Sequence, residues 1–390
     1  MSRRSALAVF ALTLALAALA ASGPVAARGG KQSLRMNEIQ VIGTHNSYHR
    51  ELSKAEVAAH DAVYGGAPIY ENFLAYSHAS LPNQLARQGM RGLELDLFPD
   101  PAGGLYANPL LRQRLAAGPL TDPEWYRPGI KVLHTEDLDY NSTCIRLLTC
   151  LSLVRTWSRA NPAHVPLLIL LELKATDPIA GALGGVPVPP WDGAALDNLD
   201  AEIRLVFRPG ELITPDDVRR RGPTLEQSVL QRGWPSLRSA RGRVMFLMDN
   251  DPGPISAAYT AGRPSLQGRV LFTNSRPGRP DAAFVKRNEP TGANLEQIQA
   301  LVRAGYVVRT RSDEPLITVL SGDQTRLRSA LASGAQVVST DFPEVGMSAR
   351  YDRDYVAALP EGGPARCNPV IKPPGCRSRN LEWTPAARAR

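Results

Sequence analysis

Short runs of apolar residues recur along the chain, and several of the segments between them repeat their apolar residues every three to four positions. Runs bounded by Gly, Pro and polar residues are typical of buried strands, whereas the longer period is typical of amphipathic helices. The predicted strands span residues 38–43, 92–98, 130–135, 166–174, 243–249, 269–274, 306–311 and 336–341.

Helical periodicity is clearest in segments that begin at Ile145, Leu196 and Leu295. A fourth segment, 324–333, stops at Gly334, a residue type that commonly follows a helix. Eight apolar strands separated by helices predict an α/β fold, a single-domain parallel barrel of the TIM (β/α)₈ type. A doubly wound open sheet is the alternative, but no G-x-G-x-x-G sequence follows any predicted strand.

The first residues have the pattern of an export signal. Arg3 and Arg4 precede an apolar run, and small residues before position 28 offer a cleavage site. The run is too short to cross a bilayer comfortably, and either general or twin-arginine export fits it. We therefore expect a secreted protein, extracellular or periplasmic. The predicted organisation is a signal peptide at 1–27, a barrel domain at 28–358 and an extended strap at 359–390.

Composition adds two constraints. The 390 residues carry 45 Lys and Arg against 37 Asp and Glu, a formal charge of +8, without the basic block expected of a nucleic-acid-binding arm. We expect no nucleic-acid partner and no obligate protein partner. The four cysteines form two closely spaced pairs, Cys144 with Cys150 and Cys367 with Cys376, which predict two local disulfides in an exported protein.

Ionisable residues collect near the ends of several predicted strands. In strand 92–98 leucines alternate with Glu94 and Asp96, so both carboxylates are predicted to point into the barrel. Two inward carboxylates require a cation or hydrogen-bond donors nearby. The same alternation places five more ionisable residues at strand ends, where barrels of this type carry their active sites. They are His134, Glu172, Lys174, Arg309 and Arg311.

Four positions could supply oxygen ligands to a metal ion. Asn46 ends the first strand, and Glu94, Asp96 and Glu172 add three carboxylates. An all-oxygen set with three carboxylates suits Ca²⁺, and less well Mg²⁺. Zinc would require His or Cys among the ligands.

These residues resemble a known family. The segment Ile-Gly-Thr-His-Asn-Ser-Tyr at 42–48 is similar to the first signature of phosphoinositide-specific phospholipase C catalytic domains, in which a catalytic His precedes a Ca²⁺-binding Asn. Three further segments resemble the family's second metal pair, its second catalytic His and its last metal Glu with a substrate-binding Lys: 94–96, 132–134 and 171–174. The strand with Arg309 and the segment 339–343 look like the closing strands of the bacterial, secreted, Ca²⁺-dependent branch.

The resemblance implies a Ca²⁺-dependent phospholipase C that cleaves phosphatidylinositol to diacylglycerol and a cyclic inositol phosphate. His45 would stabilise the transition state, and His134 would protonate the departing oxygen. A metal carboxylate, with Glu94 as the candidate, would accept the proton of the inositol 2-hydroxyl. The expected metal ligands are Asn46, Glu94, Asp96 and Glu172, and the expected substrate-binding residues are Lys174, Arg309 and Arg311.

Several alternatives remain open from sequence. A glycerophosphodiester phosphodiesterase or a phospholipase D-like enzyme of the same superfamily also pairs two histidines with a Glu-x-Asp strand, although such enzymes usually open with His-Arg-Gly. A secreted barrel that binds inositol lipids without catalysis is the non-enzymic alternative. His78 is a rival to His134 as the second histidine.

The sequence also suggests how the protein meets its substrate. Transient contact with an anionic membrane surface would fall to loop residues at the barrel rim: Tyr106, Leu110, Trp125, Tyr126 and Trp191. The remaining histidines, His49, His60 and His164, belong to no recognised constellation and are expected at the surface.

Overall fold

Eight parallel strands form the centre of the computed structural model, which describes residues 33–220 and 222–382. The predicted signal peptide at 1–27 and the end of the predicted strap lie outside the described residues. The barrel strands are β1 (Ile39–Thr44), β2 (Gly92–Phe98), β4 (Leu167–Leu173), β6 (Val244–Met248), β7 (Leu271–Thr273), β8 (Phe284–Lys286), β9 (Val307–Arg311) and β10 (Val337–Thr340).

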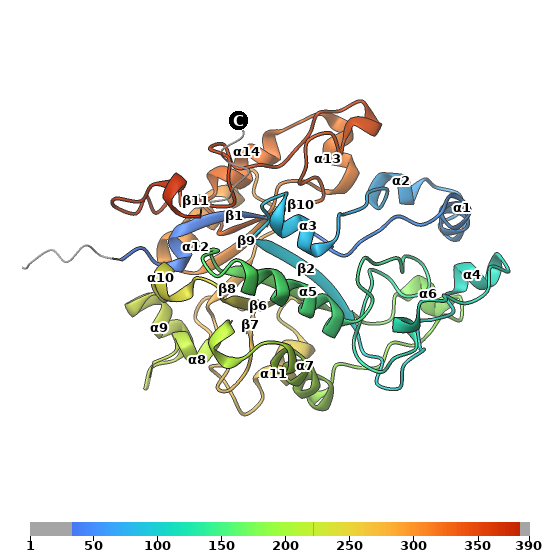
Figure 1. Ribbon diagram of the computed structural model, residues 1–390, viewed down its shortest axis with the longest axis horizontal. Helices are drawn as coiled ribbons and strands as arrows, with labels where there is room; N and C mark the ends of the chain where they lie inside the picture. The colour runs from blue at the N-terminus through green and yellow to red at the C-terminus, as the bar shows by residue number, and fades with distance from the viewer. Residues whose placement is uncertain (1–32, 221, 383–390) are drawn as a thin grey trace, which may run out of the picture. The chain divides into compact units, whose positions relative to one another are not determined.

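The strands pair in chain order around the barrel (Figure 1). β1 pairs with β2 and β10, β4 pairs with β2 and β6, and β9 pairs with β8 and β10, all parallel. β6 pairs with β7, and a parallel bridge between Asn274 and Phe284 links the end of β7 to β8. This bridge completes the circuit, so the predicted TIM-type α/β barrel is confirmed.

Helices surround the strands and extend beyond their ends. α3, α5, α7 and α11 contact one another in succession, and α12 contacts α14. All four segments with clear helical periodicity are helices: α5, α7, α12 and α14. The α-helices are α1 (Lys54–Val63), α2 (Ile69–Phe73), α3 (Leu81–Ala86), α4 (Leu110–Arg114), α5 (Leu147–Ala160), α6 (Pro178–Ala182), α7 (Gly193–Val206), α8 (Pro215–Val218), α9 (Leu225–Arg232), α10 (Leu237–Ala240), α11 (Pro254–Thr260), α12 (Ala293–Ala304), α13 (Pro315–Ser321) and α14 (Thr325–Ala332).

One of the predicted strands is wrong. The segment 130–135 is not a barrel strand, because only β3 (Lys131–Val132) is extended, and it pairs antiparallel with the end of β2. The chain then folds back in a tight hairpin, with Asp137 in the left-handed region at φ 67°. The barrel strand absent from the prediction is β8, which follows β7 without a helix between them, so the alternation of strands and helices does not mark it.

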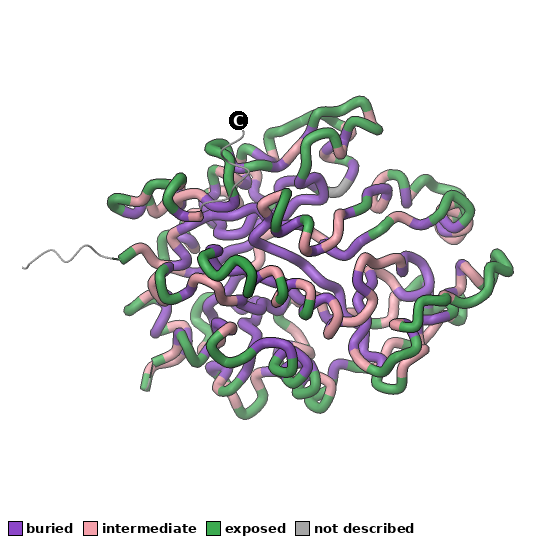
Figure 2. Tube along the Cα trace, in the orientation of Figure 1, coloured by how far each residue is buried: buried purple, intermediate pink, exposed green. Residues whose placement is uncertain are grey.

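Side-chain alternation on β2 follows the prediction. Leu93, Leu95 and Leu97 lie in the largest hydrophobic core cluster, and full burial of each contributes about 1.5–3 kcal/mol. Figure 2 shows the strands as the most continuously buried part of the molecule. β1 and β2 approach closely at Gly43 and Gly92, where a Cβ atom added to Gly43 would lie 2.8 Å from the Gly92 Cα. This contact brings the end of β1 against the start of β2.

The chain after the last barrel strand packs against the end of the barrel at which the parallel strands begin. β11 (Arg366–Cys367) pairs antiparallel with the start of β1, and Glu382 forms an ion pair with the buried Arg91. Both predicted disulfides are confirmed: Cys144–Cys150 and Cys367–Cys376. Among the described residues no helix is both long enough and apolar enough to cross a membrane.

The rim loops differ from the prediction. Trp125 is only 3% exposed, and Tyr106 and Trp191 are also buried, because these rings pack into the cores beneath their own loops. Of the five predicted rim residues, only Tyr126 is exposed, and Leu110 is partly exposed. The prediction of a membrane-facing aromatic rim is therefore wrong for three of its members.

Candidate active site

His45 follows β1 and is held by a sharp turn. Asn46 has φ 43°, a left-handed conformation that Asn tolerates better than most residues. The next residue, Ser47, then binds the backbone of Glu94 twice: its N–H donates to the Glu94 carbonyl at 2.9 Å, and its Oγ accepts from the Glu94 N–H at 2.8 Å. The signature therefore fixes His45 beside Glu94 of β2.

The proton of the His45 ring is located by its contacts. Nδ1 lies 2.9 Å from Asp341 Oδ1, which can only accept, and 3.3 Å from Arg311 Nη2, which can only donate. The shorter contact favours the tautomer in which Nδ1–H donates to Asp341. Arg311 binds the other oxygen of Asp341 at 3.2 Å. Burial, with Arg311 and Arg309 nearby, holds the pKa of His45 well below its usual value. The ring is therefore neutral near pH 7, and Nε2, 3.7 Å from Glu94 Oε1, keeps its lone pair.

Carboxylates from three strands converge on this position. Glu94 on β2, Glu172 on β4 and Asp249 directly after β6 each offer an oxygen within 4.8 Å of the others. Burial raises the pKa of Glu94 to about 7, against the opposing effect of Arg309. Asp96 lies beside this group on β2, and burial raises its pKa well above the ordinary value. Such a concentration of buried negative charge requires cations.

Basic side chains lie against each carboxylate. Lys174 Nζ is 3.1 Å from Asp96 Oδ2 and 3.4 Å from Glu172 Oε1. Arg309 donates to Glu94 Oε2 at 2.5 Å and to Ser339 Oγ at 2.9 Å. Arg309 is buried in the barrel, so its guanidinium is held in place before substrate arrives. The predicted residues of β2, β4 and β9 are therefore brought together.

The oxygen groups fit a Ca²⁺ ion. Asn46 Oδ1, Asp96 Oδ1 and Asp249 Oδ1 are buried and have no hydrogen-bond partner among the described residues. A buried oxygen without a donor is costly unless something else binds it. Neutral amide and carboxylate oxygens are the ligands that Ca²⁺ prefers. The predicted ligands, with Asp249 added, thus supply a suitable donor set.

His134 stands at the start of the hairpin that replaces the predicted strand. The backbone N–H groups of Thr135 and Asp139 each donate to the other's carbonyl at 2.9 Å, which places Asp139 beside His134. His134 Nδ1–H donates to Asp139 Oδ2 at 3.0 Å, and the ring remains 23% exposed. Burial lowers the pKa of His134, although Asp139 opposes this effect.

His78, the rival histidine, has a different environment. Its Nε2–H donates to the main-chain carbonyl of His45 at 2.8 Å, and its Nδ1 is buried without a partner among the described residues. Burial lowers the pKa of His78 to about 4. This geometry supports the turn at His45 and leaves His78 poorly placed to reach a substrate.

Sequence reasoning missed several residues of the site. Asp249 ends a predicted strand and could have been noticed, whereas Lys286, which binds Asp249 at 2.8 Å, lies on the unpredicted β8. The expectation that His49, His60 and His164 lie at the surface is wrong, because all three are buried.

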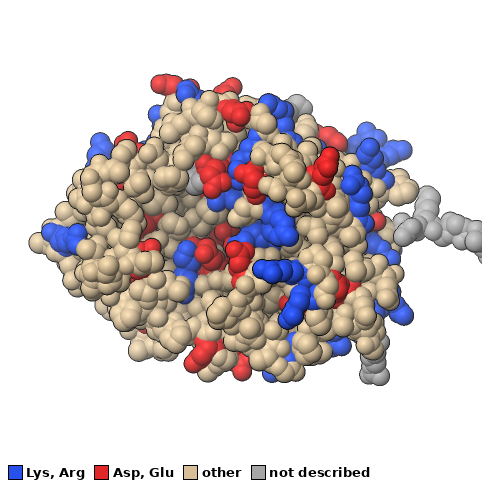
Figure 3. Space-filling view, turned by 180° about the vertical axis from the view of Figure 1, so that it is seen from behind, with Lys and Arg blue, Asp and Glu red and all other residues tan. Residues whose placement is uncertain are grey.

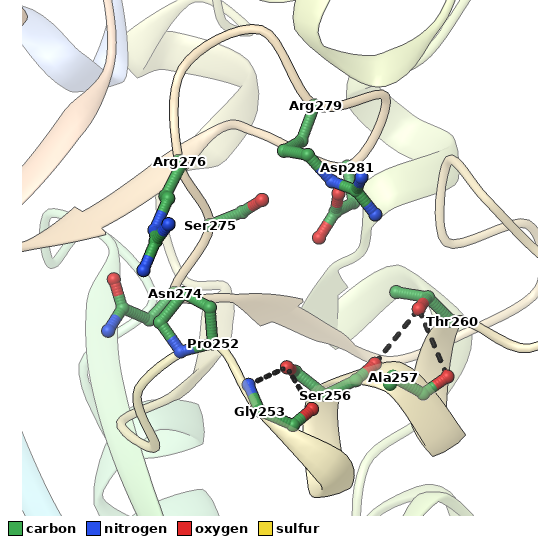
Figure 4. Close-up of a pocket in the computed structure, with 10 residues that line it drawn as sticks. All are labelled: Pro252, Gly253, Ser256, Ala257, Thr260, Asn274, Ser275, Arg276, Arg279 and Asp281. Atoms are coloured by element: carbon green, nitrogen blue, oxygen red, sulfur yellow. Dashed lines mark hydrogen bonds between the residues drawn. The ribbon is translucent and has the colours of Figure 1, made fainter.

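Two cavities are lined by the loops that follow β6 and β7, at the end of the barrel that carries the catalytic candidates. One of about 310 Å³ and another of about 450 Å³ share Pro252, Asn274, Ser275 and Arg276 in their walls. In Figure 4, Arg276 and Arg279 lie on either side of Ser275, facing the α11 residues of the first cavity. Figure 3 shows acidic and basic side chains gathered around a hollow on one face of the molecule. The rim is therefore both recessed and charged.

Comparison with known proteins agrees with this arrangement. A family model described as phosphoinositide phospholipase C, Ca²⁺-dependent, matches residues 34–369. A comparison with curated proteins finds no match.

Among solved structures, the chain is similar to a calcium-dependent phosphoinositol-specific phospholipase C from a Pseudomonas species. The apo form has a TM-score of 0.51 and 14% identity over 87% of this chain and 97% of that chain. Its myoinositol complex gives a TM-score of 0.51 and 13% identity over 86% and 96%. A Ca²⁺-dependent enzyme from Streptomyces antibioticus is 18% identical over 80% and 96%, with a TM-score of 0.47.

The solved structures support the fold, and the family match covers most of the chain. The family consists of phosphoric diester hydrolases that use Ca²⁺, and the site described above supplies oxygen ligands for that ion. The chain belongs to the family of Ca²⁺-dependent phosphoinositide phospholipases C.

Proposed function

We propose that this enzyme cleaves phosphatidylinositol into diacylglycerol and a cyclic inositol phosphate by acid–base catalysis with His45 and His134. One observation carries the proposal. Each of these histidines donates Nδ1–H to a carboxylate, Asp341 or Asp139, and so presents Nε2 for proton transfer. Two imidazoles held in this way beside a group of oxygen ligands suit the movement of one proton from an attacking hydroxyl and of another to a leaving oxygen.

His45 is the proposed acceptor of the first proton. Its Nε2 lone pair faces the carboxylate group, where the inositol 2-hydroxyl would lie. The alternative base, Glu94, has one oxygen bound to Arg309 and belongs to the carboxylate group proposed to hold Ca²⁺, which favours His45. His134 would act from its protonated form, in which Nδ1–H is bound to Asp139 and Nε2 carries a second proton. As the 2-oxygen attacks phosphorus, this imidazolium would donate its Nε2 proton to the glycerol oxygen while the bond from phosphorus to that oxygen breaks, which leaves His134 neutral.

The proposed Ca²⁺ ligands are Asn46, Glu94, Asp96, Glu172 and Asp249. When bound, Ca²⁺ would increase the acidity of the 2-hydroxyl and neutralise negative charge on the phosphoryl oxygens. Lys174 and Arg309 are proposed to hold the phosphate and the inositol hydroxyls. Arg311, which also binds the Asp341 carboxylate beside His45, is proposed as a further substrate-binding residue. Plain phosphatidylinositol remains the proposed substrate.

An assay on lipid vesicles tests this function. The purified protein should release water-soluble inositol phosphate from phosphatidylinositol vesicles, and a chelator should abolish the release until Ca²⁺ is restored. Release of choline or glycerol phosphate instead, or activity unaffected by chelator, would favour the related phosphodiesterase or phospholipase D-like reaction. Binding without product would favour the non-catalytic alternative.

Export is proposed for this enzyme. The two disulfides are typical of proteins that fold outside the reducing cytoplasm. We propose an extracellular or periplasmic location after removal of residues 1–27. Amino-terminal sequencing of the exported protein should begin at Arg28, and an intact first segment would contradict removal at this point.

Contact with an anionic membrane is proposed at the rim that carries the cavities. Arg276 and Arg279 are exposed there, and neither lies within 4 Å of a carboxylate among the described residues. A basic residue near an anionic surface contributes about 1 kcal/mol to binding. The exposed Val345, which closely follows β10, adds apolar surface among the loops that follow the strands.

Reversing both rim charges should weaken membrane binding. In an Arg276→Glu, Arg279→Glu variant we expect vesicle affinity at low salt to fall at least about tenfold, because two attractive charges become repulsive. Sedimentation with phosphatidylinositol-containing vesicles measures this change. The double variant Arg238→Glu, Arg303→Glu is the matched control, since both arginines are exposed at the opposite end of the barrel, on α10 before β6 and on α12 before β9. Equal losses in the two variants would show a dependence on net charge alone.

A further inference from the structure

His49 is completely buried, with 0% of its surface exposed, and both of its ring nitrogens have partners. Nδ1 lies 2.9 Å from the main-chain carbonyl oxygen of Tyr76. Nε2 lies 2.8 Å from Asp139 Oδ2. A carbonyl and a carboxylate can only accept hydrogen bonds, so each nitrogen must carry a proton. The geometry therefore requires a doubly protonated, positively charged imidazolium.

His164 shows the contrasting case in the same chain. It is equally buried, and its Nδ1 donates to the Val165 carbonyl at 2.6 Å. Its Nε2, however, lies 2.7 Å from Ser158 Oγ, a hydroxyl that can donate to it. Burial accordingly lowers the pKa of His164. The pKa of His49 is raised despite burial, because Asp139 and the Tyr76 carbonyl outweigh the loss of water.

Asp139 joins the two histidines. The oxygen that accepts from His49 also accepts from His134 Nδ1–H at 3.0 Å, and Tyr70 OH donates to the other oxygen at 3.4 Å. Burial alone would raise the pKa of Asp139, but its two histidine partners hold it below the usual range. The carboxylate is therefore ionised, and a single oxygen serves both rings.

The backbone fixes this arrangement. An antiparallel bridge joins His49 to Ser142, and Thr143 N–H donates to the Tyr48 carbonyl at 2.7 Å. The segment after β1 and the hairpin that carries His134 are thus tied side by side. His49 and Asp139 are held by main-chain contacts that do not depend on substrate.

We propose that His49 is a buried cation that positions Asp139 and thereby makes His134 a better proton donor to the leaving oxygen. This inference rests on the proposed role of His134 as the acid. An unpaired Asp139 carboxylate would stabilise the protonated form of His134 strongly and hold its proton back. The positive charge on His49 offsets that attraction while leaving the Nδ1–H hydrogen bond intact. His49 is a positioning residue, since its own nitrogens are both occupied.

Other charged and titratable groups face these rings and must be included in any pH analysis. Besides Asp139, His134 is influenced by Lys174, and it acts in turn on His45. His49 is also influenced by Asp341 and acts on His78. Tyr76 and Tyr70 remain neutral, since burial raises the pKa of each. None of these groups supplies a second cation to Asp139.

The protonation of His49 can be observed without activity. In ¹⁵N-histidine-labelled wild-type protein at pH 7, both ring nitrogens of His49 should carry protons, whereas His164 should carry one. An unprotonated ring nitrogen on His49 at pH 7 would overturn the proposal. Because this spectrum does not depend on turnover, it separates a failure of this inference from a failure of the proposed enzyme function.

The kinetic test uses His49→Gln, in which the amide can still donate to Asp139 but the charge is lost. A general acid is active below its pKa, so the alkaline limb of the kcat profile follows His134. Without the cation this limb should move to higher pH by about one unit, with a lower kcat on its plateau. His164→Gln should leave the limb in place. A lower kcat with no movement of the limb would show a merely structural role for His49 and contradict the proposal.

Discussion

Replacing His45 with alanine is expected to lower kcat about 10³-fold while leaving the Ca²⁺ dissociation constant nearly unchanged. The loss falls in the range found for removal of a general acid or base. Ca²⁺ binding should persist because His45 supplies none of the proposed ligand atoms, and the turn at Asn46 is fixed by backbone contacts of Ser47 with Glu94. Initial rates on phosphatidylinositol vesicles and calorimetric Ca²⁺ titration measure the two quantities separately.

Asp341→Asn provides the companion variant. An asparagine could donate from its NH₂ group to His45 Nδ1 and so favour the tautomer that carries its proton on Nε2. In that tautomer Nε2 has no free lone pair and cannot accept the proton of the 2-hydroxyl. Its kcat should therefore fall, and the double variant with His45→Ala should lose little beyond His45→Ala alone, since the two residues act as a unit. If His45→Ala retained more than about a tenth of wild-type kcat, the base would have to be sought among the carboxylates.

The barrel and the placement of Glu94 and Asp96 followed directly from residue order. Leucines at 93, 95 and 97 must face the surrounding helices, and the fixed alternation of a strand then leaves the carboxylates no other direction. The same reasoning was correct for Arg309, which lies on β9, and for Lys174, which directly follows β4. Where apolar residues alternate with polar ones along a strand, the sequence alone is enough to predict which side chains point into the barrel.

The errors share a physical cause, because they concern elements held by partners distant in sequence. The segment 130–135 has the composition of a strand, yet its backbone pairs antiparallel with the end of β2. β8 has only three residues, and its pairing with β9 compensates for its weak local signal. His49 is buried by Tyr76 and Asp139, and neither contact can be deduced from local spacing.

The rim residues illustrate the limit of composition as a guide to exposure. Trp125, Trp191 and Tyr106 lie in long loops, where aromatic rings can either meet a membrane or fill the space beneath the loop. Trp191 Nε1 donates to the Lys174 carbonyl at 3.0 Å, and Tyr106 OH donates to the Pro99 carbonyl at 2.9 Å. These contacts retain the three rings inside the protein, so the proposed membrane contact depends on the exposed Arg276, Arg279 and Val345 and not on these rings.

Asp249→Asn is the second substitution for which a large effect is expected. Asp249 was not among the ligands predicted from sequence, but one of its oxygens completes the group formed with Glu94 and Glu172. Its Oδ1 is buried without a partner among the described residues, and its Oδ2 accepts from Lys286 at 2.8 Å. Loss of one carboxylate from a Ca²⁺ site weakens binding through both charge and ligand strength. We expect the Ca²⁺ dissociation constant to rise at least about tenfold, a cost of about 1.4 kcal/mol.

Two matched variants separate a ligand role from simple pairing with Lys286. Asp251 also lies near Lys286 Nζ, at 3.6 Å, but is 82% exposed, so Asp251→Asn should leave Ca²⁺ affinity unchanged. Lys286→Met removes the cation that pairs with Asp249 and should not weaken Ca²⁺ binding, since a competing positive charge is lost. Excess Ca²⁺ should restore most of the kcat of Asp249→Asn, because the catalytic histidines remain in place. If Asp249→Asn bound Ca²⁺ as tightly as the wild type, the ligand set would reduce to the four residues expected from sequence, and the Asp249 carboxylate would serve only to hold Lys286.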